Sequence, residues 1–184
     1  MKLLLSSLVF LLVLQTHASI GQLAVKGGSW SFQTENVRST SEASSGVGAY
    51  SFEIGYQLAP KWMGVFGINI LMSDIYTGSS AYGFDLGAKY FPLTQTGTLD
   101  MQSDSGSLFI QEKWRPYVGL FLRQRIFNLA LSSSYMGPGL SVGVDYAWSR
   151  RWFINGEIRY DYLYGQGDAL AKQINMLVGL GLEF

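Results

Sequence analysis

Apolar and polar side chains alternate along much of this chain, in segments of about a dozen residues. In the segment 47–58, for example, Phe52 and Ile54 flank Glu53, and the same alternation continues on both sides. Successive side chains of a β-strand point to opposite faces, so this pattern predicts a strand with one apolar face and one polar face.

Eight segments carry this alternation, the first less regularly than the others. They span 22–35, 47–58, 62–73, 81–91, 116–127, 139–148, 151–164 and 174–184. The polar face of the set is rich in glycine and carries nine charged residues: Glu53, Asp85, Lys89, Arg123, Arg125, Asp145, Glu157, Arg159 and Asp161. Eight such strands are enough to close a small barrel.

The polarity of the two faces separates two kinds of barrel. A soluble ligand-binding barrel encloses its apolar face and shows its polar face to water. An apolar exterior around a charged interior would aggregate in water, but it is the arrangement of outer-membrane barrels. We therefore expect an all-β fold, a transmembrane up-and-down antiparallel β-barrel of eight strands.

The charged face predicts a network of ion pairs inside the barrel. The interior of an eight-stranded barrel is just wide enough for side chains to fill it, and buried charges are tolerated when they are paired and hydrogen-bonded. We therefore interpret the nine charged residues as a structural network in a plugged lumen, with a proton or ion pathway as the alternative.

The first residues have the layout of a secretory signal peptide. Lys2 precedes an apolar run, and small residues follow, with cleavage expected after Ala18 or Gly21. The run is shorter than the roughly 20 residues of a membrane-spanning helix. The expected organisation is a signal peptide at 1–21 and a barrel domain at 22–184, whose last segment pairs with the first to remove both sheet edges.

The connections between segments predict the orientation. The stretches 59–61 and 149–151 are tight turns, whereas 35–46, 76–81, 132–139 and 165–172 are rich in serine and glycine and are expected to be loops. Barrels of this kind place short turns in the periplasm and longer loops outside. Four tryptophans near the short turns fit an aromatic girdle: Trp62, Trp114, Trp148 and Trp152. Both termini are therefore expected on the periplasmic side.

Composition excludes several functions. There is no cysteine, and the one histidine, His17, lies in or beside the signal peptide. The mature chain then lacks the usual bases that activate a serine and the commonest metal ligands, so we expect no catalytic residue, metal or cofactor. Acidic and basic residues balance at 13 each, which argues against a nucleic-acid partner because such proteins present a basic face.

Two stretches resemble the superfamily of small eight-stranded outer-membrane barrels, the OmpW-like, OmpX-like and OmpA-like proteins. They are "RPYVGL" from Arg115 and "GPGLSVGVDYAWSRRWFINGEIRYDYL" from Gly137. The resemblance implies a monomer in the cell outer membrane, in contact with lipids and lipopolysaccharide. A terminal Phe184 after alternating apolar residues is similar to the signal that the barrel assembly machinery reads, so that machinery is an expected transient partner.

One segment departs from this resemblance. Residues 93–115 are much longer than a usual periplasmic turn, and we expect a hairpin there, turning around Asp104, Ser105 and Gly106. For function, the sequence favours a non-enzymatic structural or envelope role. The alternative is passage or binding of small or hydrophobic molecules, as the OmpW-like resemblance implies, and a surface-interaction role is a third possibility.

Overall fold

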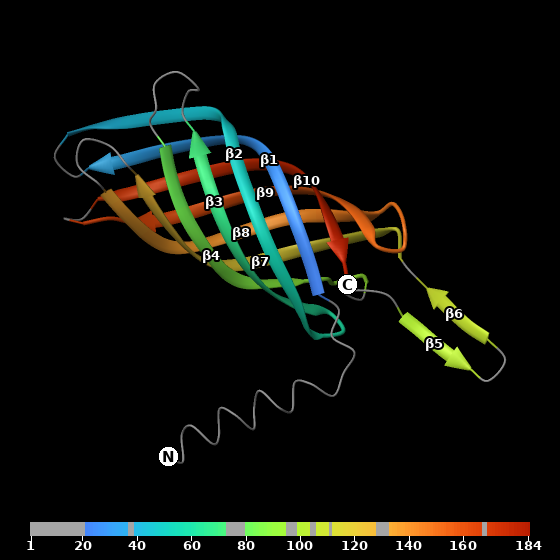
Figure 1. Ribbon diagram of the computed structural model, residues 1–184. Coiled ribbons are helices and arrows are strands. Elements are labelled where there is room, and N and C mark those ends of the chain that lie inside the picture. Colours follow the sequence, from blue (N-terminus) through green and yellow to red (C-terminus); the bar gives the residue numbers. More distant parts are fainter. Residues whose placement is uncertain are drawn as a thin grey trace, which may run out of the picture.

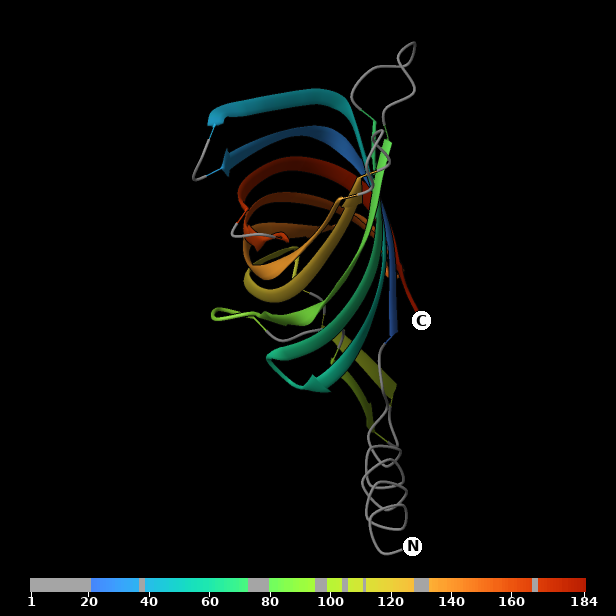
Figure 2. The same ribbon diagram turned by 90° about the vertical axis from the view of Figure 1, so that its left-hand side faces the viewer.

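The computed structural model describes residues 21–36, 39–72, 80–94, 99–103, 106–110, 112–127, 133–166 and 169–184. They form ten β-strands: β1 (Gly21–Asn36), β2 (Ser39–Ala59), β3 (Trp62–Met72), β4 (Ser80–Tyr90), β5 (Leu99–Ser103), β6 (Gly106–Ile110), β7 (Trp114–Phe127), β8 (Ser133–Ala147), β9 (Trp152–Tyr164) and β10 (Leu170–Glu183). Eight of them close into an antiparallel barrel in the order β1-β10-β9-β8-β7-β4-β3-β2, seen from two sides in Figures 1 and 2. The predicted eight-stranded up-and-down barrel is confirmed.

The barrel closes where its first strand meets its last. Leu23 pairs with Leu182 and Ser31 with Ile174 along the β1–β10 ladder. The ladder extends to the last residue, since the backbone N–H of Phe184 donates to the Gly21 carbonyl at 2.9 Å and the backbone N–H of Gly21 donates to the Phe184 carbonyl at 2.8 Å. No strand edge of the barrel is left open, so every strand has a hydrogen-bonded neighbour on both sides.

Strands β1 and β2 are longer than predicted. The prediction of a loop at 35–46 is wrong, because the β1–β2 ladder continues to the pair Asn36 and Ser39. The register shifts by one residue between the pairs Gly28–Ala49 and Trp30–Gly46. Such a bulge bends a strand and increases its twist, and both strands curve over the barrel in Figures 1 and 2.

The loop expected at 132–139 is also mostly strand, since β8 begins at Ser133. The hairpin expected within 93–115 is present: β5 and β6 pair antiparallel, with Leu99 opposite Ile110 and Ser103 opposite Gly106. Asp104 and Ser105, the predicted turn, lie outside the described residues. Figure 1 shows this hairpin beyond the end of the barrel at which the chain ends.

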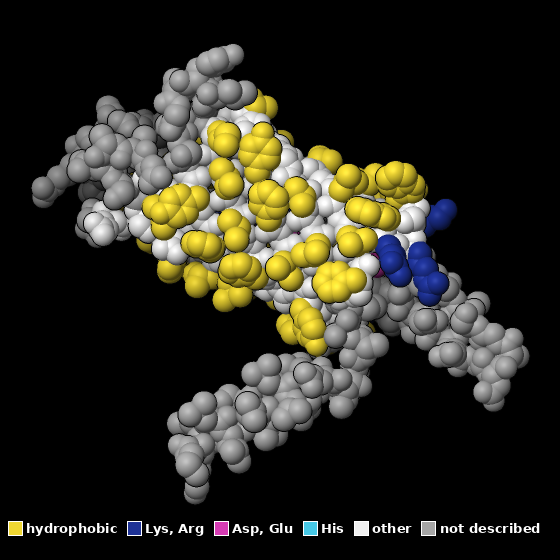
Figure 3. Space-filling view, in the orientation of Figure 1, with side chains coloured by type: hydrophobic (Ala, Val, Ile, Leu, Met, Phe, Trp, Pro, Cys, Tyr) yellow, Lys and Arg dark blue, Asp and Glu magenta, His cyan; other side chains and the backbone are white. Residues whose placement is uncertain are grey.

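The exterior of the barrel is apolar and its interior polar, as the alternation predicted. On β3 and β9 exposed and enclosed residues alternate strictly. Apolar side chains cover the wall in the space-filling view of Figure 3, and Leu86 and Val178 are 63% and 65% exposed. No helix among the described residues is long and apolar enough to span a membrane.

Candidate functional site: the charged lumen

The charged side chains reach the lumen because each of them occupies an inward-facing position in the alternation along its strand. Glu157, Arg159 and Asp161 lie two residues apart on β9, so all three point inward, and each is at most 3% exposed. Their outward neighbours Ile158 and Tyr160 are exposed. The same rule encloses all nine charged residues named from the sequence.

Arg159 is the central cation of the lumen. One of its terminal nitrogens, Nη2, lies 3.0 Å from Glu157 Oε2 and also pairs with Glu53. The other, Nη1, lies 3.2 Å from Asp85 Oδ2 and donates to Asn69 Oδ1 at 2.9 Å. A planar guanidinium presents several donors in a fixed fork, so this one side chain connects β9 with β2, β3 and β4.

Two lysines complete the environment of Glu53. Lys26 Nζ and Lys89 Nζ both lie 2.8 Å from Glu53 Oε2, and Lys26 also pairs with Glu157. Glu53 therefore lies among three cations, those of Lys26, Lys89 and Arg159. Such a carboxylate has its buried charge compensated on several sides, which offsets the cost of removing it from water.

A second group of pairs joins β4, β7 and β9. Arg125 Nη1 lies 2.7 Å from Asp85 Oδ1, and Arg125 Nη2 lies 3.5 Å from Asp161 Oδ2. Arg123 pairs with Asp161, and its Nε lies 3.6 Å from Asp85 Oδ2. Asp85 links this group to Arg159, so eight of the nine residues named from the sequence form one continuous network.

Asp145 is the exception, because it belongs to a separate group near the termini. Asn155 Nδ2 donates to Asp145 Oδ1 at 2.6 Å, and Arg115 Nη2 lies 3.9 Å from Asp145 Oδ2. Arg115 also pairs with Glu183, which accepts a bond from Gln22 Nε2 at 2.8 Å. These five residues hold β1, β7, β8, β9 and β10 together at this end of the lumen.

Three lumen charges are not among the nine named from the sequence: Lys26, Arg115 and Glu183. The two-residue alternation places the first two on the inward face. Lys26 follows the exposed Val25, and Arg115 lies an even number of residues before the enclosed Arg123. With these three included, the described residues enclose six cations and six carboxylates. The fixed charge of the described lumen therefore sums to zero.

Apolar residues occupy the lumen on either side of the main network. One buried cluster, toward the barrel end away from the termini, includes Trp30, Phe32, Leu71 and Phe127. The rings of Phe32 and Phe127 are 4.4 Å apart between centroids. The other buried cluster, toward the termini, comprises Met63, Val65, Phe91, Tyr117 and Phe121. The Phe121 ring lies 4.7 Å from the Arg123 guanidinium, so it also borders the charges.

One small cavity lies beside the charges of the described lumen. A cavity of about 10 Å³ lies next to Glu53, Lys89 and Met63, which is room for about one water molecule. Among the described residues no three histidine, cysteine or acidic side chains are grouped to hold a metal ion. Among the described residues, the lumen is therefore an array of oppositely charged side chains in contact with one another.

Together, the closed ladder, the apolar wall and the charged interior define a β-barrel of the outer-membrane type. No model of a known family matches the sequence, and no curated protein sequence matches it. Solved structures do match, at identities that establish the fold alone. The chain has the fold of the small eight-stranded outer-membrane barrels.

Three of these structures illustrate the likeness. Neisserial surface protein A superposes with a TM-score of 0.60 at 15% identity, covering 91% of this chain and 100% of that one. A major outer membrane protein from Thermus thermophilus gives 0.58 at 14% identity, with 91% and 100% covered. The N-terminal β-barrel domain of Pseudomonas aeruginosa OprF gives 0.55 at 16% identity, with 89% and 99% covered.

Proposed function

We propose that this chain is an integral outer-membrane barrel with a structural, non-enzymatic role and a closed lumen. The observation that carries the proposal is the balanced set of six cations and six carboxylates that the described residues place inside the barrel. A pore for ions needs a continuous water path and usually an excess of one charge. Here the charges are engaged with one another, and buried apolar clusters lie on both sides of the main network.

The proposal includes an orientation and a set of partners. Two tight turns, β2–β3 and β8–β9, lie at the same end of the barrel as the start of β1 and the end of β10 (Figure 1). The tryptophans Trp62, Trp114, Trp148 and Trp152 are exposed beside them. Short turns and an aromatic girdle are features of a periplasmic rim. We place both termini there, with membrane lipids and lipopolysaccharide around a monomeric barrel. Phe184, 67% exposed, remains available to the assembly machinery.

Conductance of the wild-type barrel tests the closed lumen. The folded protein is reconstituted in a planar bilayer, and insertion is verified separately by protease protection in vesicles of the same lipid. We expect inserted protein with no steady single-channel steps. Steady steps from inserted protein would overturn the proposal and favour the alternative function, passage of small molecules.

A further inference from the structure

A groove lies on the outer wall of the barrel, close to the rim that carries the termini. It has a volume of about 660 Å³, within the roughly 300–1,000 Å³ of small-molecule sites. Its lining is almost entirely apolar and comes from β3, β4, β7 and β8: Trp62, Gly87, Ala88, Tyr90, Val118, Gly119, Leu120, Leu140, Ser141 and Val142.

The groove exists because one outward position carries a small side chain. Ala88 is paired with Leu120, which is paired in turn with Leu140, so larger residues stand on one side of it. On the rim side the rings of Trp62 and Tyr90 pack at 4.8 Å between centroids. The hollow over Ala88 therefore ends at an aromatic pair, at the depth where a lipid chain joins its headgroup.

A cation lies directly beyond this aromatic pair. Lys61 precedes Trp62, and its Nζ donates to the Pro92 carbonyl at 3.0 Å. Trp62 and Tyr90 are paired in the β3–β4 ladder, and Lys61 and Pro92 lie beyond them on the rim side. The bond therefore holds the ammonium group at the rim end of these two strands. Lys61 is exposed, so the ammonium group is accessible from solvent and from the membrane interface.

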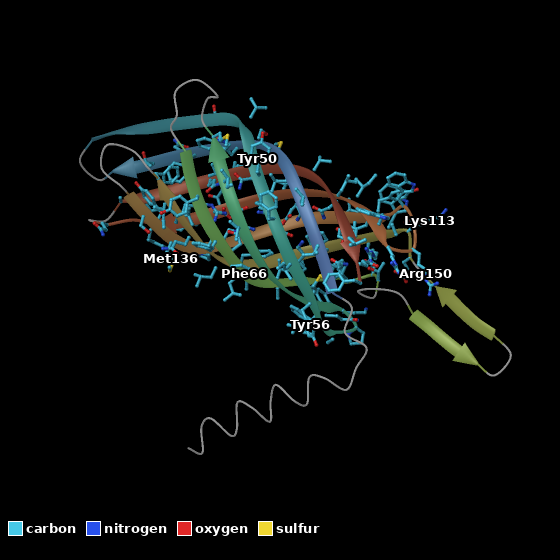
Figure 4. All side chains as sticks on the ribbon, viewed as in Figure 1. Tyr50, Tyr56, Phe66, Lys113, Met136 and Arg150 are labelled. Carbon is cyan, nitrogen blue, oxygen red and sulfur yellow. The ribbon has the colours of Figure 1, made fainter. Side chains whose placement is uncertain are left out.

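The surrounding rim has the same sign of charge. The exposed cations at this end include Lys113, Arg150 and Arg151, and Glu112 is the exposed acid among the described residues here. Figure 3 shows the visible lysine and arginine side chains gathered at this end of the barrel, and Figure 4 labels Lys113 and Arg150 there. An apolar groove that ends at a cationic rim is complementary to an amphiphile with a negative head.

We propose that this groove is a binding site for one anionic phospholipid, with an acyl chain over Ala88 and the headgroup phosphate at Lys61. The inference rests on the proposed membrane location. A zwitterionic lipid carries its own ammonium group and competes with Lys61 for the phosphate, whereas an anionic lipid does not. Each lysine near a membrane surface contributes about fivefold to the binding of anionic lipid.

Native mass spectrometry of the full barrel tests the proposal. The protein in neutral detergent is given equal amounts of phosphatidylglycerol and phosphatidylcholine with identical chains, and the ratio of the two bound lipids is measured. We expect the wild type to retain phosphatidylglycerol preferentially. Lys61→Gln should lower the ratio by about fivefold, whereas Arg150→Gln, which removes a rim charge away from the groove, should leave it unchanged.

A second pair of variants locates the acyl chain. Ala88→Phe fills the groove and should reduce the bound fraction of both lipids, whereas Leu86→Phe, at the next outward position of β4 and outside the groove, should not. Equal effects of Lys61→Gln and Arg150→Gln, or of Ala88→Phe and Leu86→Phe, would overturn the site. A wild type without headgroup preference overturns the site alone, whereas a conducting wild type that keeps the preference overturns only the closed lumen.

Discussion

Arg159 Nη1 on β9 lies 3.2 Å from Asp85 Oδ2 on β4, and this ion pair crosses the lumen between strands that are not neighbours in the barrel. The same guanidinium group pairs with Glu53 and Glu157. One side chain therefore connects distant parts of the wall through the interior. The hydrogen-bonded ladders hold each strand to its neighbours, and Arg159 adds a connection across the barrel.

Replacing Arg159 with methionine should strongly destabilise the barrel. The variant leaves Glu53, Asp85 and Glu157 with less compensating charge in a water-poor interior, and removing one partner of a buried pair costs about 3–5 kcal/mol. Urea unfolding in lipid vesicles measures the change. Arg150→Met, at an exposed turn, should change the free energy of unfolding by less than about 0.5 kcal/mol; equal losses in the two variants would contradict the central role of Arg159.

An arginine in the middle of the outer wall should also be costly. Val178 lies in the outward row of β10, between Met176 and Leu180, and is 65% exposed. Val178→Arg places a charge in lipid, and the expected cost is about 2–4 kcal/mol near the bilayer midplane. Ser45→Arg, on the extended part of β2, is the control and should be tolerated. If unfolding free energies show both substitutions to be neutral, the outer wall does not face lipid.

Two glycines should respond differently to alanine. A Cβ at Gly181 would collide with the Phe153 ring inside the barrel, whereas a Cβ at Gly156 meets nothing within 4 Å. Overpacking costs about 1–3 kcal/mol, so Gly181→Ala should lower the free energy of unfolding and Gly156→Ala should not. Adding Phe153→Leu to Gly181→Ala should restore part of the loss. Failure of that rescue would place the strain elsewhere.

The hydrogen bonds that close the barrel favour one of the two cleavage sites expected from the sequence. Gly21 exchanges two backbone hydrogen bonds with Phe184, and cleavage after Gly21 would remove both. Of the two sites expected from the sequence, cleavage after Ala18 keeps the pair. Mass spectrometry of the barrel isolated from the membrane should therefore find Ser19 as the first residue, and a chain beginning at Gln22 would contradict this.

The direction of a side chain was predictable wherever the alternation is strict. Phe52 and Glu53 could be assigned to opposite faces from sequence alone, and the structure agrees. Lys26 was missed because Gly27, Gly28 and Ser29 interrupt the pattern just after it. Arg115 was missed because it lies between Trp114 and Pro116, a context that is typical of a turn.

The partners of each charge were not predictable in the same way. Whether Arg159 meets Asp85 or Asp145 depends on how far each strand is shifted along its neighbour, and alternation carries no information about that shift. The long β1–β2 hairpin was hidden for a related reason. Ser39 to Ser45 have the composition of a loop, but backbone pairing with β1 extends them into a strand.

Lys26 adds an electrostatic link across the closing seam. It is the charged lumen residue that β1 contributes among the described residues, and it pairs with Glu53 and Glu157. Glu53 lies on β2, which neighbours β1 directly, whereas Glu157 lies on β9, on the far side of β10. The pair of Lys26 with Glu157 therefore bridges the closing seam from inside the barrel, and a shift in the register of β1 against β10 would separate these two buried charges, which disfavours the shifted seam.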